Sequence, residues 1–131
     1  MNDGRTPTLE PPREIRLVRA EKRLAVTFAD GTEAVLPAEY LRVESPSAEV
    51  QGHSPEQKVT VAGKRAVGIS GIEPVGHYAI RILFDDGHDS GIYSWEYLAR
   101  LAAEREERWA GYLAALSAQG LSRDPPQRQR H

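Results

Sequence analysis

The sequence contains no cysteine in its 131 residues. This absence excludes disulfide bonds, metal or iron–sulfur sites built on thiolates, and catalysis by a cysteine nucleophile. No apolar run approaches the ~20 residues that a membrane-spanning helix needs. The first residues, MNDGRTPTLEPPRE, lack the apolar segment of a secretory signal. We therefore expect a cytoplasmic protein that does not associate with membranes.

The chain also has no excess of positive charge, because Lys and Arg number 17 against 19 for Asp and Glu. Without a strong basic field we expect no nucleic-acid partner. Hydrophobic residues make up 40% and charged residues 27%, which is typical of a single soluble domain. Both ends are rich in Gly, Pro and polar residues, which predicts a flexible leader at 1–12, a domain at 13–120 and a flexible tail at 121–131.

Two Asp-Gly pairs organise the expected strands. Asp30-Gly31 lies between two alternating runs, a pattern typical of a hairpin with a two-residue turn, in which Val26 would face Val35. Asp86-Gly87 is expected to turn a second hairpin in the same way. Strands are expected at 15–19, 24–29, 32–36, 59–61, 67–72, 77–84 and 88–93, with a helical turn at 37–42, an exposed loop at 44–58 and a turn at 73–76.

A single long helix is expected at 95–119. Ser94 is suited to its N-cap and Gly120 to its end. One apolar stripe recurs at helical spacing, formed by Leu98, Leu101, Ala102, Trp109, Tyr112, Leu113 and Leu116. The charged residues at 104–108 are expected to face solvent. The pattern thus predicts an α+β fold with two mostly antiparallel hairpin units and a long C-terminal amphipathic helix.

The two halves resemble each other. The run Phe28-Ala29-Asp30-Gly31 is followed by Glu39-Tyr40-Leu41, as Phe84-Asp85-Asp86-Gly87 is followed by Glu96-Tyr97-Leu98. The second half carries one additional residue between the turn and the EYL motif. We interpret this as an internal pseudo-repeat whose hairpins cover each other or share the final helix.

The densest polar cluster is Asp85-Asp86-Gly87-His88-Asp89. Carboxylates and an imidazole so close together can bind a divalent metal. With a two-residue turn, Asp85 and His88 would pair across the strands, and further ligands would come from His53 or His77. The simpler interpretation, which we favour, is a hairpin turn whose Asp residues bond to turn backbone and whose His lies at the surface.

Catalytic patterns are absent from the sequence. Ser54, Ser70 and Ser90 have no nucleophile elbow, and there is no phosphate-binding glycine loop. His88 is followed directly by Asp89, so no His-x-Asp pair begins a non-haem iron triad. Trp109 and Tyr112 could form a recognition surface, although aromatic residues at helical spacing are more often core.

Two long segments resemble a known family. Residues 72–79, IEPVGHYA, and 84–98, FDDGHDSGIYSWEYL, are similar to small bacterial proteins built from the N-terminal domain of gamma-butyrobetaine hydroxylase. The resemblance covers about residues 13–102. A similar module is also attached to some Mrp-type iron–sulfur carrier ATPases.

In the hydroxylases, this module holds a structural zinc ion through a C-x-C-x-x-C cluster and one histidine. The resemblance places Ser45, Ser47 and Val50 at the three cysteine positions and His88 at the histidine position. Neutral hydroxyls are poor zinc ligands and valine is none, so we expect the zinc site to be lost. The catalytic iron residues belong to a separate domain, so the resemblance does not imply oxygenase activity for this chain.

The resemblance implies a non-catalytic binding or adaptor domain that acts with a metalloprotein or iron–sulfur assembly system, and not an enzyme. Its partner would be a protein or a second copy of the chain, with Trp109 and Tyr112 as candidate contacts. We expect no resident cofactor. The alternative is an iron- or zinc-binding protein with a weak site at Asp85 and His88. Beside Asp85, the His88 ring is expected to have a slightly raised pKa.

Overall fold

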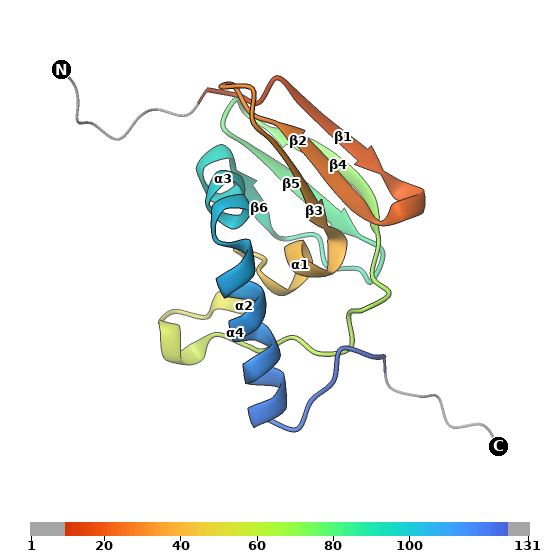
Figure 1. The fold of residues 1–131 in the computed structure, drawn as a ribbon, viewed down its shortest axis with the longest axis vertical. Coiled ribbons are helices and arrows are strands. Elements are labelled where there is room, and N and C mark those ends of the chain that lie inside the picture. The colour runs from red at the N-terminus through yellow and green to blue at the C-terminus, as the bar shows by residue number, and fades with distance from the viewer. Residues whose placement is uncertain (1–9, 126–131) are drawn as a thin grey trace.

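The structure, a computed structural model, describes residues 10–125 and forms an α+β fold, as predicted. One antiparallel sheet has the order β1-β2-β3 and the other the order β4-β5-β6 (Figure 1). The strands are β1 (Glu14–Val18), β2 (Arg23–Thr27), β3 (Glu33–Pro37), β4 (Ile69–Val75), β5 (Ala79–Phe84) and β6 (Ile92–Ser94). The α-helices are α1 (Ala38–Val43), α2 (Ala48–Gln51), α3 (Trp95–Ala103) and α4 (Arg105–Ala118), with short 3-10 turns at Arg19–Glu21 and Pro55–Gln57.

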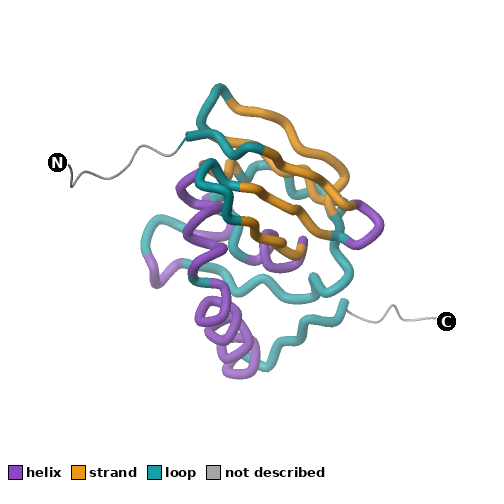
Figure 2. The backbone as a smooth tube through the Cα atoms, turned by 45° about the horizontal axis from the view of Figure 1, so that its top comes forward, coloured by secondary structure: helices purple, strands orange, loops and turns teal. Residues whose placement is uncertain are grey.

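The internal repeat is confirmed as two units of three strands and a helix. β3 leads directly into α1, and β6 leads directly into α3. Ser94 caps α3, as predicted, because its hydroxyl accepts a hydrogen bond from the Tyr97 N–H at 3.0 Å. The strands group on one side of the molecule and the α-helices gather on the other (Figure 2).

The two hairpin turns contain one residue more than predicted. The Phe28 N–H donates to the Thr32 carbonyl, and the Phe84 N–H donates to the His88 carbonyl, so each loop has three residues. Gly31 and Gly87 both have φ of 92°, which a side chain would strain. In the first hairpin the extra residue shifts the register, and Val26 faces Ala34 instead of Val35. An Asp-Gly pair serves both turn types, so the local sequence does not distinguish them.

The main core lies between the two sheets and the helices. Both sheets and helices α1 and α3 contribute buried side chains to it, among them Leu24, Val26, Leu36, Leu41, Ile80, Ile82, Tyr93, Leu98 and Leu101. A smaller cluster joins Val43 to Tyr112 and Leu116 of α4. Burial of these apolar surfaces makes the largest favourable contribution to the free energy that holds the two units together.

The segment 44–58 is not the exposed loop that its composition predicts. It contains α2, and Glu44, Ser45, Ser47 and Val50 are buried. The hairpin of β5 and β6 packs against this segment, and such a long-range contact leaves no mark on local composition. Residues 59–61 form no strand, and residues 73–75 extend β4 instead of turning, with the turn at 76–78.

The long helix predicted at 95–119 is divided at Glu104 into α3 and α4. Glu104 has φ of −105° and ψ of 19°, although the sequence has no Gly or Pro there. The break lets Leu98 and Leu101 pack on the main core while Tyr112 and Leu116 reach the smaller cluster. The stop at Gly120 is confirmed, since this glycine has φ of 68° just beyond the helix.

The residues that follow Gly120 pack against the domain instead of beginning a loose tail. The Arg123 guanidinium donates to the buried Glu39 carboxylate at 2.7 and 2.8 Å. The Gly63 and Arg65 N–H groups donate to the carbonyls of Ser122 and Arg123. The predicted leader and tail otherwise fall largely on 1–9 and 126–131, outside the described residues.

Candidate functional site

The turn of the β5–β6 hairpin positions His88. The Asp86 carboxylate accepts a hydrogen bond from the His88 N–H at 3.1 Å, which fixes the backbone at the end of the turn. The His88 ring is buried, with 7% of the residue exposed, and packs at a tilt beside Phe84. His88 is therefore not the surface residue that the simpler interpretation predicts.

Two residues of the 44–51 segment bind the ring. His88 Nε2 lies 2.9 Å from the Ser45 hydroxyl oxygen, and Nδ1 lies 3.1 Å from Glu49 Oε1. With a neutral ring, Nδ1–H donates to the carboxylate and Nε2 accepts from the serine hydroxyl. Ser45 is fully buried, whereas the Glu49 side chain is mostly exposed to solvent and contacts the ring from outside.

The pKa of His88 is lowered, contrary to the rise expected from an Asp85 neighbour. Burial is the largest cause and the positive charge of Arg42 is the second, and together they outweigh Glu49 and Asp86. Asp85 is not the partner of the ring, because its carboxylate accepts from the Gly68 N–H at 3.0 Å. The extra residue in the turn accounts for this difference.

The segment at the implied cysteine positions does meet the hairpin that carries His88. The Ser47 and Ser90 hydroxyls lie 2.8 Å apart, and the Ser47 N–H donates to the Ser45 hydroxyl at 3.2 Å. These side chains do not fit zinc, since two are neutral hydroxyls already paired with protein groups and Val50 offers no donor atom. Hydrogen bonds between protein groups connect the two segments here.

The Asp86 carboxylate of the hairpin is also engaged by protein groups. Asp86 accepts from Arg42 Nε at 2.8 Å and lies 2.6 Å from Lys64 Nζ. Burial acts to raise its pKa, but hydrogen bonds from Lys64, the His88 backbone and Arg42 lower it to about 2. His53 and His77 lie on exposed loops. Within residues 10–125, no group of three or more His, Cys, Asp or Glu could hold a metal ion.

The hydrogen bonds that link Ser45 to His88 and His88 to Glu49 are arranged as in the triad of a serine hydrolase. The surroundings of these residues do not suit catalysis. A catalytic serine must reach a substrate carbonyl, and Ser45 has no exposed surface. The backbone of Gly91 closes over it so tightly that a Cβ at this glycine would lie 2.5 Å from the Ser45 hydroxyl. The three residues therefore form a structural hydrogen-bonded chain.

The two candidate contact residues on α4 differ in exposure. Tyr112 is buried, and its hydroxyl donates to the Val61 carbonyl at 2.6 Å. Burial raises its pKa to about 12. Trp109 is half-buried and lines an open groove of about 470 Å³ between α1 and α4, beside Pro37, Ala110 and Leu113. Trp109 thus lines the α1–α4 groove, whereas Tyr112 lines a separate and smaller pocket beside Val43 and Lys58.

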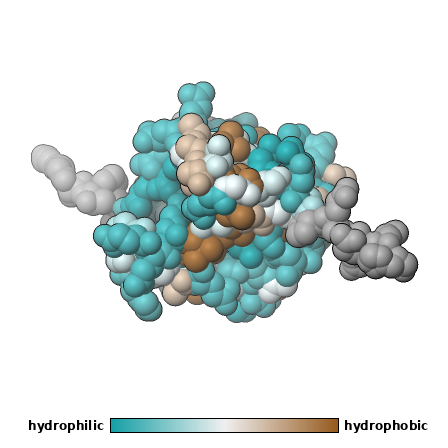
Figure 3. Space-filling model, turned by 90° about the horizontal axis from the view of Figure 1, so that it is seen from below, coloured by the Kyte–Doolittle hydropathy of each residue, from teal (hydrophilic) through white to brown (hydrophobic). Residues whose placement is uncertain are grey.

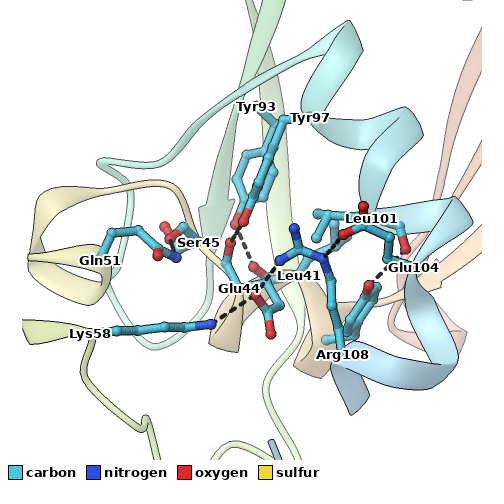
Figure 4. A network of polar contacts seen from close by, with 11 residues as sticks. Leu41, Glu44, Ser45, Gln51, Lys58, Tyr93, Tyr97, Leu101, Glu104 and Arg108 are labelled. Carbon is cyan, nitrogen blue, oxygen red and sulfur yellow. Dashed lines mark hydrogen bonds and ion pairs between the residues drawn. The ribbon is translucent and has the colours of Figure 1, made fainter. Parts of the chain in front are cut away.

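A buried carboxylate that the sequence did not reveal organises the junction of the two units (Figure 4). Glu44 Oε1 lies 2.9 Å from Arg108 Nη1 and 3.1 Å from Lys58 Nζ. Its backbone carbonyl accepts from the Tyr97 hydroxyl at 2.6 Å. Arg108 also pairs with Glu104 at 2.8 Å, so the charged run at 104–108 is only partly a solvent-exposed face.

These features define an α+β domain built from two related units and held by buried polar contacts. The model of the family described as "Gamma-butyrobetaine hydroxylase-like, N-terminal" matches residues 15–99. The chain belongs to this family, as its resemblance indicated. No curated protein matches the chain. None of the helices in residues 10–125 is long and apolar enough to cross a membrane.

Solved structures similar to the chain include two NMR structures and a crystal structure. One protein with an NMR solution structure is 46% identical, with 95% of this chain and 98% of that chain covered and a TM-score of 0.78. A second NMR structure is 41% identical, with 98% and 99% covered and the same TM-score of 0.78. A crystal structure of a DUF971-family protein of unknown function from Acidithiobacillus ferrooxidans is 43% identical, with 71% and 93% covered and a TM-score of 0.59.

Proposed function

We propose that the chain is a non-catalytic binding or adaptor domain that acts with a metalloprotein or iron–sulfur assembly system. The observation that carries this proposal is the contrast between its polar cluster and its surface. Ser45, Ser47 and His88, which resemble parts of a catalytic or metal site, are buried and hydrogen-bonded to protein groups, whereas the groove beside Trp109 is open. Membership in a family named after a metalloenzyme's N-terminal domain supports the choice of partner.

The α1–α4 groove has the composition of a protein-binding surface. Its apolar part comes from Pro37, Trp109 and Leu113. Charged residues of both signs surround that part, including Arg105 and Glu106. Interfaces commonly combine an aromatic anchor with a polar rim. A hydrophobic patch lies amid hydrophilic side chains on the face seen in Figure 3, which views the molecule from the lower end of Figure 1.

Capture of partners from the native host, followed by mass spectrometry, tests this proposal. Leu113→Lys places a charge in the groove at a residue that is 39% exposed. Ile92→Lys, at 45% exposure on β6, is the matched control. We expect wild type and Ile92→Lys to retain the same metalloprotein or assembly factor and Leu113→Lys to lose it. Recovery of no such protein, or equal recovery by Leu113→Lys, would refute the proposal.

A further inference from the structure

The internal repeat allows the two units to be compared position by position. The turn aspartate of the second hairpin, Asp86, corresponds to Asp30 of the first. The residue directly after the EYL motif is Arg42 in the first unit and Ala99 in the second. Each hairpin tip packs against the helix of the other unit, so Asp86 faces Arg42 and Asp30 shares a pocket with Ala99.

In the pairing of the second hairpin with α1, the side chain of Arg42 fills the space between the hairpin tip and the helix. The Arg42 side chain is largely buried, and its Nε donates to Asp86 Oδ2 at 2.8 Å. The other carboxylate oxygen, Oδ1, accepts from the backbone N–H two residues further on. One oxygen thus belongs to the turn, and the other accepts a charge-assisted contact from the guanidinium and also lies 2.6 Å from Lys64 Nζ.

In the other pairing the arginine is missing and a pocket remains. Asp30 Oδ1 accepts from the Thr32 N–H at 3.0 Å, as Asp86 Oδ1 does from its own turn. With Ala99 in place of arginine, the hairpin and α3 enclose a pocket of about 570 Å³. The volume is sufficient for a long side chain and the neighbouring backbone.

The lining of this pocket is complementary to a cation with an aliphatic stem. Phe28, Trp95 and Ala102 supply apolar and aromatic surface, which suits the stem and flat face of an arginine. Three acidic residues line it, Glu10, Asp30 and Glu33, and among residues 10–125 no basic residue does. Arg13 lies near Gly31 and makes only the smallest of the contributions to the pKa of Asp30, whose lowering is due chiefly to Thr32.

We propose that this pocket binds an arginine side chain presented by a partner protein, with the guanidinium on Asp30 in the manner of Arg42 on Asp86. The stem would lie along the alanines of α3, and Glu33 would add negative charge at the mouth. The inference extends the proposed binding role to a second surface. It is tested without the native partner, so its failure and the failure of the α1–α4 groove are distinguishable.

The test is an NMR titration of ¹⁵N-labelled protein with an acetylated and amidated peptide, Ala-Ala-Arg-Ala-Ala, and with its uncharged citrulline counterpart. We expect saturable shifts at the β2–β3 turn and α3 with the arginine peptide alone. Asp30→Asn is expected to weaken binding about fivefold, the scale of an exposed ion pair. Ala99→Arg is expected to abolish it by filling the pocket from within, whereas Ala114→Arg on α4 adds the same charge and leaves it unchanged.

Three results would overturn the proposal. Equal shifts with the arginine and citrulline peptides would show that charge is not recognised. Undiminished binding by Ala99→Arg would place the peptide elsewhere. Shifts at the same positions that change when the protein alone is diluted would assign the pocket to a second copy of this chain. The spectrum of each variant shows directly whether it is folded, so an unfolded variant is not mistaken for a loss of binding.

Discussion

Tyr40 and Tyr97 occupy equivalent positions in the two units, and each holds the helix that carries the other. The Tyr40 hydroxyl donates to the Leu101 carbonyl at 2.7 Å, and the Tyr97 hydroxyl donates to the Glu44 carbonyl at 2.6 Å. Each acceptor lies one helical turn beyond the partner tyrosine. The repeat in the sequence therefore corresponds to an approximate two-fold relationship between α1 and α3.

Removal of either hydroxyl should destabilise the junction. Tyr40→Phe is expected to lower the free energy of unfolding by about 1–2 kcal/mol, because it leaves a buried carbonyl without this donor. Tyr97→Phe should cost less, because Tyr97 is only half-buried. Urea unfolding measures both, with Tyr78→Phe at an exposed position as the control. An equal effect of Tyr40→Phe and Tyr78→Phe would contradict the structural role.

Glu44 should be the most sensitive of the carboxylates at the junction. Its side chain is 4% exposed and lies beside Arg108 and Lys58. Glu44→Gln is expected to lower the free energy of unfolding by about 2 kcal/mol, because two cations lose a buried partner. Glu104→Gln removes the more exposed carboxylate on the same arginine, and we expect it to cost under about 0.5 kcal/mol. The reverse order in denaturant melts would disprove this assignment.

The lowered pKa of His88 predicts a loss of stability in mild acid. Below about pH 6.5 the unfolded chain takes up a proton on this histidine, while the folded state, whose pKa lies lower, resists it. The free energy of unfolding should therefore fall as the pH drops from 7.5 to 5.5. His88→Gln should reduce that slope in urea unfolding at the two pH values. An unchanged slope would show that another group is responsible.

The sequence predicted the strands of both sheets, the positions of both Asp-Gly turns though not their length, the Ser94 cap and the repeat, because each depends on local chemistry. It failed where distant contacts decide the outcome. Ser45 lies in a polar segment whose composition predicts an exposed loop. It is nevertheless buried, because the second hairpin packs on it. The break at Glu104 likewise follows from two separate surfaces that α3 and α4 must cover. The resemblance pointed to residues 45–50 and His88, and the structure brings Ser45 and His88 into contact without thiolates.

Metal content is the most direct measurement of the central claim that the Ser45–His88–Glu49 chain is a structural unit and not a metal centre. Elemental analysis of the untagged protein should find far less than one metal ion per chain, and EDTA should leave its melting temperature unchanged. Both follow because each polar atom of His88 has a protein partner at hydrogen-bond distance. One zinc or iron ion per chain, abolished by His88→Gln and accompanied by a chelator-induced drop in melting temperature, would contradict the account.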